Sequence, residues 1–171
     1  DRQSVDYPYK GMNELLYGMR TGELITFTAG TGAGKSSIMR ELEHHLLNNT
    51  DSNIGIISLE ENVKQTIFHL MSVEASKRLY IKEIREQVPQ EQLAHYEQAT
   101  VGTGRVFAFD HFGSIQTDEI LARVRYMDSS QSGLKRLFCE SGTLTIFIKC
   151  LIMVTVSLNC SWLSLYESRS L

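Results

Sequence analysis

The stretch LITFTAGTGAGKSS, residues 24–37, decides the fold of this chain. An apolar run rich in β-forming residues leads into a glycine-rich loop, and apolar residues at helical spacing follow it. Glycines between a strand and a helix let backbone N–H groups turn towards phosphate oxygens, and the helix N-terminus favours negative charge. The stretch therefore predicts a phosphate-binding loop between a buried strand over 24–29 and a helix over 36–48.

The loop matches the Walker A pattern G-x-x-x-x-G-K-[ST] except at its first position, where Ala29 stands for glycine. Lys35 is expected to reach the β and γ phosphates as a catalytic residue, and Ser36 to bind Mg²⁺. A glycine-rich turn without a ligand is the alternative, but the spacing of the glycines, Lys35 and Ser36 favours ATP or another NTP with Mg²⁺. The predicted nucleotide-binding residues are Ala29, Gly30, Thr31, Gly32, Ala33, Gly34, Lys35, Ser36 and Ser37.

Strand and helix patterns alternate as far as residue 127. Apolar runs at 54–59 and 106–109 predict two further strands. Asn62 is a good N-cap for a helix through about Leu79, two more helical segments flank Pro89, and a helix is expected over 117–127. This alternation predicts an α/β fold with a mainly parallel sheet.

The second predicted strand ends in the sequence SLEEN, residues 58–62. Functional groups of parallel α/β sheets lie at the carboxyl ends of the strands, so Glu60 could orient water towards a γ-phosphate. The alternative is that both glutamates only favour the N-terminus of the next helix. Glu61 fits that structural role better than Glu60 does.

The amino-acid composition excludes few classes of function. The chain has 17 basic and 20 acidic residues, so bulk charge does not indicate a nucleic-acid binder. Its three cysteines form no CxxC pair, which argues against a zinc site and gives no support for a disulfide framework.

Residues 128–171 differ in composition from the rest of the chain. They are rich in serine and leucine, and no aspartate follows Asp128. The run IFIKCLIMVTVSL, residues 146–158, is short for a membrane span and contains Lys149, so we expect no membrane contact. A buried strand pair and out-of-frame or intron-derived translation are the alternatives, and we expect an irregular, non-native tail.

Three segments together resemble the ATPase domain of DnaB-type replicative helicases: residues 12–37, 54–66 and 106–127. The likeness covers about residues 10–127 and is greatest to phage primase–helicases and the mitochondrial Twinkle helicase. It implies a RecA-like P-loop core, a homo-hexamer, and NTP hydrolysis coupled to movement along single-stranded DNA. A replication polymerase and a primase are implied partners. The implied location is the cytoplasm of a bacterial or phage-infected cell, or the mitochondrion for a Twinkle relative.

The same resemblance implies roles for individual residues. Glu60 occupies the position of the catalytic base. Lys77 and Arg78 lie where such helicases carry a basic residue near the subunit interface, although an exposed basic pair is usually only solvated. In the family, the segment similar to residues 109–114 comes one strand before the Walker B strand, whose aspartate orients Mg²⁺.

The Walker B aspartate is the missing feature. Asp110 follows an apolar strand and is one candidate metal ligand. The other interpretation is that the Walker B strand is absent, so that the fold is truncated after the third strand, at 106–109. We then expect a domain over 1–127, an atypical tail over 128–171, weak folding and little activity. A RecA/RadA- or KaiC-like ATPase and a non-catalytic, truncated nucleotide-binding product are the alternative functions.

Overall fold

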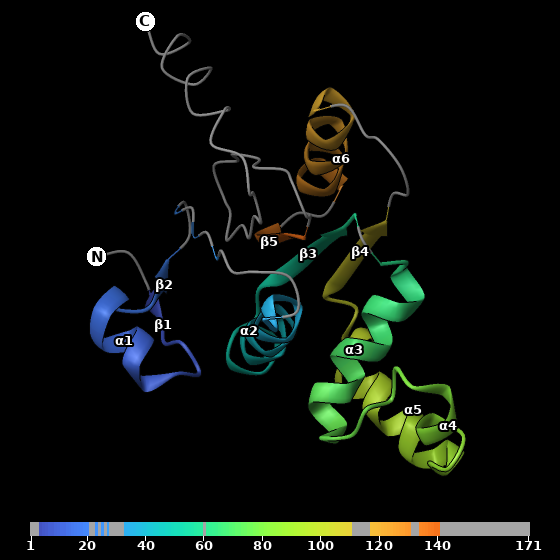
Figure 1. Ribbon diagram of the computed structural model, residues 1–171. Coiled ribbons are helices and arrows are strands. Elements are labelled where there is room, and N and C mark those ends of the chain that lie inside the picture. The colour runs from blue at the N-terminus through green and yellow to red at the C-terminus, as the bar shows by residue number, and fades with distance from the viewer. Residues whose placement is uncertain are drawn as a thin grey trace, which may run out of the picture.

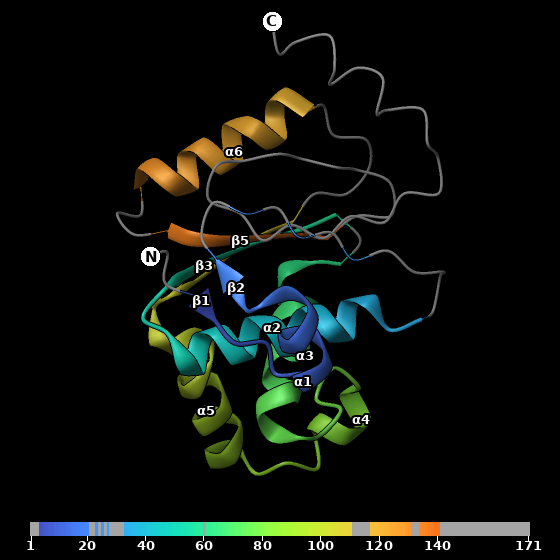
Figure 2. The same ribbon diagram turned by 90° about the vertical axis from the view of Figure 1, so that its left-hand side faces the viewer.

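A computed structural model describes residues 4–20, 23, 25, 27, 33–59, 61–110, 117–130 and 134–140 of the chain. Two helices lie on one face of a small parallel sheet and a third helix on the other (Figures 1 and 2). In chain order the elements are β1 (Ser4–Val5), α1 (Lys10–Leu16), β2 (Met19–Arg20), α2 (Lys35–Asn49), β3 (Asn53–Ser58), α3 (Val63–Ala75), α4 (Lys82–Arg85), α5 (Gln90–Ala99), the 3₁₀ turn η1 (Val101–Thr103), β4 (Val106–Asp110), α6 (Thr117–Ser130) and β5 (Leu134–Glu140).

The sheet has the strand order β4-β3-β5, and both neighbours run parallel to β3. The central strand β3 is the apolar run predicted at 54–59, and its residues from Ile54 onward are buried. Covering helices explain this burial, because a central parallel strand is covered on both faces. α2 and α3 lie on one face of the sheet and α6 on the other, as the two views agree (Figures 1 and 2).

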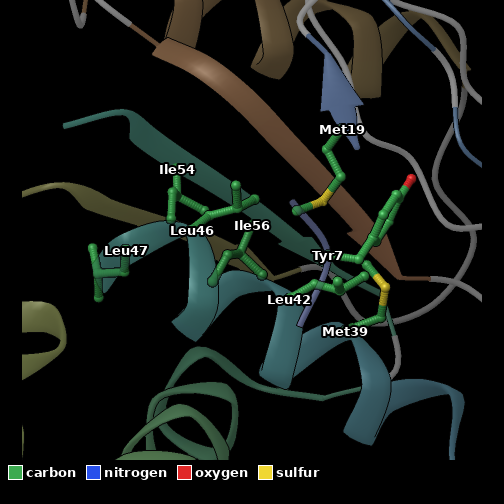
Figure 3. Packing of buried hydrophobic residues seen from close by; sticks show 8 residues of the cluster. All are labelled: Tyr7, Met19, Met39, Leu42, Leu46, Leu47, Ile54 and Ile56. Atoms are coloured by element: carbon green, nitrogen blue, oxygen red, sulfur yellow. The ribbon is translucent and has the colours of Figure 1, made fainter. Parts of the chain in front are cut away.

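The main core lies between α2, the sheet and the N-terminal segment (Figure 3). Leu42 and Leu46 of α2 are fully buried and recur four residues apart, which places both on the helix face that meets β3. The expected strand over 24–29 lies largely outside the described residues, although Ile25 and Phe27 pack against this core. Its buried members are Tyr7, Met19, Met39, Leu42, Leu46, Leu47, Ile54 and Ile56.

The helix predicted from Asn62 to about Leu79 is shorter than expected. Asn62 is the N-cap, and its side chain accepts a hydrogen bond from the Gln65 N–H at 2.8 Å. At the other end Ser76 adopts a left-handed conformation, with φ of 50°. This turn ends α3 at Ala75 and sends Leu79, which is fully buried, into a second cluster with Met71 and Val88.

The expected truncation of the sheet after residues 106–109 is wrong. α6 continues through Ser130, and β5 then pairs with β3 over six register positions, from Asn53↔Leu134 to Ser58↔Glu140. A strand beside β3 is favoured because it completes the backbone hydrogen bonds of that central strand. The division into domains at residue 127 stays a prediction, and residues 141–171 of the expected tail lie outside the described residues.

Candidate functional site

The predicted phosphate loop leads into the N-terminus of α2. Gly34 is the N-cap and has a φ of 88°, a left-handed conformation that favours glycine. A Cβ atom built on Gly34 would meet nothing within 4 Å, so the requirement is conformational and not one of space. Lys35 and Ser36 form the first turn and are half-buried, while Ala33, Gly34 and Ser37 are exposed. Residues 29–32, which complete the predicted loop, lie outside the described residues.

The first turn of α2 suits an anion. Gly34 supplies no side-chain cap, and the first turn contains no acidic residue. The first N–H groups of a helix have no partner within the helix, and the helix dipole attracts negative charge to them. Lys35 and Ser36 add a cation and a hydroxyl at the same place. These residues therefore fit the triphosphate of a nucleotide with its Mg²⁺.

A tight turn follows β3. Ser58, the last residue of that strand, is 1% exposed, and its Oγ accepts a hydrogen bond from the Glu61 N–H at 3.1 Å. Glu60 directly precedes Glu61 in the sequence and lies outside the described residues, so its predicted role as catalytic base stays a prediction. The carboxylate of Glu61 lies near two basic side chains: Oε2 lies 3.9 Å from Nη2 of Arg40, and Oε1 lies 3.6 Å from Nε2 of His69. Glu61 thus links α2 to α3.

Asp110 serves the N-terminus of α3. Its Oδ2 accepts a hydrogen bond from the Val63 N–H at 2.7 Å, next to the Asn62 cap. This hydrogen bond occupies one carboxylate oxygen of Asp110, the residue that the sequence predicts as a metal ligand. Within the part of the chain that the structure describes, no group of three His, Cys, Asp or Glu residues could hold a metal ion. Asp110 as a magnesium ligand stays a prediction.

Glu140 is a candidate that sequence reasoning missed. It is the last residue of β5, and Ser58 stands opposite both Glu140 and Asp110 in the two strand pairings. The carboxyl ends of three parallel strands thus bring Asp110, Ser58 and Glu140 to one edge of the sheet. This strand does not match the pattern of an apolar strand ending in aspartate, because LKRLFCE, residues 134–140, carries Lys135 and Arg136 and ends in glutamate.

The predicted interface residues lie away from this edge. Lys77 and Arg78 are exposed and directly follow Ser76, the C-cap of α3. The 13 residues of α3 separate them from the Glu61 turn, a length of about 20 Å. α3 therefore separates Arg78 from the Glu61 turn, and the role of Arg78 at a subunit interface stays a prediction.

The N-terminal segment is bound to the outer face of α2. The Tyr9 hydroxyl donates a hydrogen bond to Glu41, and Nε2 of His45 lies 2.8 Å from the Asp6 carbonyl oxygen. The pKa of Tyr9 lies well above its ordinary value, because burial disfavours the phenolate and the Glu41 carboxylate adds to the effect. These two contacts attach the N-terminal segment to α2, the helix that follows the phosphate loop.

None of the helices within the described residues has the length and apolar character that a membrane crossing requires.

Comparison with known proteins identifies a family and a relative of this chain. The model of the DnaB-like helicase C terminal domain family matches residues 4–140. The chain is also similar to a DNA helicase/primase of Enterobacteria phage T3, at 27% identity over 120 residues. That alignment covers 69% of this chain and 21% of the phage protein, so the chain spans about a fifth of its relative. The family match includes α6 and β5 and extends beyond the likeness seen in the sequence. The chain belongs to the DnaB-like helicase C-terminal domain family.

Proposed function

We propose that this chain is the nucleotide-binding part of a replicative DNA helicase. One observation carries the proposal: the left-handed Gly34 opens α2 without a side-chain cap and places Lys35 and Ser36 in its first turn. In a DnaB-like domain this arrangement supports binding of ATP or another NTP with Mg²⁺. The family membership favours a helicase over a RecA/RadA- or KaiC-like ATPase.

Each site residue has a role in this proposal. Lys35 binds the β and γ phosphates through its ammonium group, and Ser36 holds Mg²⁺ through its hydroxyl. Glu60, in the turn after β3, orients the attacking water. Glu140 is proposed as the acidic residue on the metal side, because β5 ends beside β3 at the same edge of the sheet. Bound Mg²⁺ would supply charge stabilisation for the transferred phosphoryl group.

The larger assembly is proposed on the family alone. Hydrolysis would drive movement along single-stranded DNA within a ring of copies of the parent protein, with Arg78 near a subunit interface. Partnership with a primase and a polymerase, the relationship to Twinkle and the cellular location stay predictions. Binding of nucleotide without turnover is the second candidate, because β5 ends in Glu140 and not in aspartate.

Nucleotide titration of the full chain tests the proposal. Mg·ATP should bind the wild type, and Lys35→Ala should weaken binding by about 100-fold, which corresponds to ~2.7 kcal/mol. Lys82→Ala is the matched control, because Lys82 is also the first residue of a helix, α4, and is exposed. Equal affinities for the wild type and Lys35→Ala would contradict the proposal. Release of phosphate, measured with and without single-stranded DNA, separates the helicase from the non-catalytic alternative.

A further inference from the structure

A buried charged cluster lies between α2 and α3. Arg40, on α2, is 2% exposed, and its Nη1 donates to both carboxylate oxygens of Glu43 at 2.7 and 2.8 Å. Glu43 is 1% exposed. The Nη2 atom of Arg40 lies 3.9 Å from Oε2 of Glu61, which stands in the turn between β3 and α3. Arg40 therefore connects the helix that begins at the phosphate loop to the turn after β3.

Glu61 is held from three directions. Its N–H donates to Ser58 Oγ, and its carboxylate lies between Arg40 and His69. His69 is itself fixed, since its ring stacks on Tyr80 with centroids 4.2 Å apart. The Ser58–Glu61 hydrogen bond closes the turn at its two ends. Glu60, the proposed catalytic base, directly precedes Glu61 in the sequence.

We propose that Arg40 is a positioning residue that couples the phosphate-loop helix to the turn after β3, acting through Glu61. This inference rests on the proposed function, because it concerns a nucleotide at the N-terminus of α2. Arg40 lies five residues after Lys35 on the same helix. A helix moves as a rigid element over such a distance. A change at the first turn of α2 is therefore carried to the Arg40 guanidinium and from there to the Glu61 carboxylate.

A contact between a histidine of α2 and a glutamate of α3 provides the control. Nε2 of His44, on α2, lies 2.6 Å from Oε2 of Glu74, on α3. Glu61 and Glu74 are exposed to a similar extent, 23% and 24%. Glu74 lies in the last turn of α3, at the opposite end of that helix from Glu61. Loss of the His44–Glu74 pair loosens the packing of α2 on α3 without touching that turn.

Hydrogen exchange read by mass spectrometry tests the coupling on the full chain, with Mg·AMP-PNP as the nucleotide probe. In the wild type we expect the nucleotide to slow amide exchange in two regions, residues 34–40 and residues 58–63. Glu61→Gln should keep the first response and reduce the second by about fivefold, the size expected for a partly exposed ion pair. Glu74→Gln should keep both responses.

A conservative variant separates charge from shape. Glutamine is closer in shape to glutamate than aspartate is, but only aspartate keeps the carboxylate. Glu61→Asp should therefore recover more of the response at 58–63 than Glu61→Gln, whereas a role in packing alone predicts the reverse. Because a packing defect alters exchange with and without nucleotide alike, the difference caused by the nucleotide isolates the coupling.

Any other result of the exchange experiment contradicts either the coupling through Glu61 or the proposed function. A response at 58–63 that survives in Glu61→Gln, or that is lost equally in Glu74→Gln, overturns the role of Arg40 and Glu61. Slowing at 34–40 in the wild type without any slowing at 58–63 overturns the same inference and leaves the proposed function intact. No slowing at 34–40 overturns the proposed function and the inference with it.

Discussion

Replacing Arg40 with methionine would remove the cation that binds Glu43 in the interior of the protein. Methionine has an unbranched side chain that can occupy the space of the arginine stem. The two carboxylate oxygens of Glu43 would then lose hydrogen bonds of 2.7 and 2.8 Å while the side chain stayed almost fully buried. The variant therefore tests the largest concentration of charge that the described core contains.

The expected loss is large. Removing one partner of a buried ion pair costs about 3–5 kcal/mol, because the remaining charge has left water without its counter-charge. Natural domains are stable by about 5–15 kcal/mol, so Arg40→Met should lower a substantial part of the free energy of unfolding. Replacing both residues, as Arg40→Met with Glu43→Leu, removes both charges. Because replacing a whole buried pair by apolar residues is often neutral, the double variant should be more stable than Arg40→Met alone, by about 3–5 kcal/mol.

Urea unfolding followed by far-ultraviolet circular dichroism measures these differences. With a slope of about 2 kcal/mol per molar urea, Arg40→Met should lower the midpoint by about 1.5–2.5 M relative to the wild type. Lys82→Ala, on the exposed side of α4, is the control and should leave the midpoint unchanged. Additive losses, with the double variant less stable than either single variant, would refute the reasoning from buried charge.

Three further predictions concern the ends of α2 and α3 and the N-terminal segment. Lys35→Ala should abolish most Mg·ATP binding in calorimetric titration and leave the unfolding midpoint unchanged, because Lys35 lies in the first turn of α2. Asp110→Ala should lower the free energy of unfolding by about 1 kcal/mol, since the Val63 N–H loses its acceptor, and Asp110→Asn should lose less; unchanged stability with weakened Mg²⁺ binding would contradict this structural role. The raised pKa of Tyr9 means that the folded state retains the phenolic proton above the ordinary pKa of about 10, so the unfolding free energy should fall as the pH rises beyond that value. Tyr9→Phe should remove that part of the alkaline decline in pH-dependent unfolding, and an unchanged decline would contradict it.

The parts of the fold that local sequence determines were predictable. The apolar run at 54–59 became β3, and Asn62 became the cap of α3, because side-chain burial and capping depend on a few neighbouring residues. Pro89 likewise marks the start of α5. The phosphate loop carries its own signal, since the glycine spacing reports the left-handed conformation found at Gly34.

The missed features depend on the tertiary structure. Ser76 adopts a left-handed conformation that serine rarely favours, so no local rule marks the end of α3 there. β5 has two basic residues near its start, and its place beside β3 becomes visible only with the whole sheet. Arg40 and Glu61 are distant in sequence, and no local sequence pattern around either residue predicts their contact.

The most direct test of the central claim is a crystal structure of the full chain with Mg·AMP-PNP. We expect the β and γ phosphates at the first turn of α2, within hydrogen-bond distance of Lys35. We expect Mg²⁺ on the Ser36 hydroxyl, on the side of the sheet edge where β5 ends at Glu140. A nucleotide bound away from the N-terminus of α2, or no bound nucleotide at saturating concentration, would contradict the central claim.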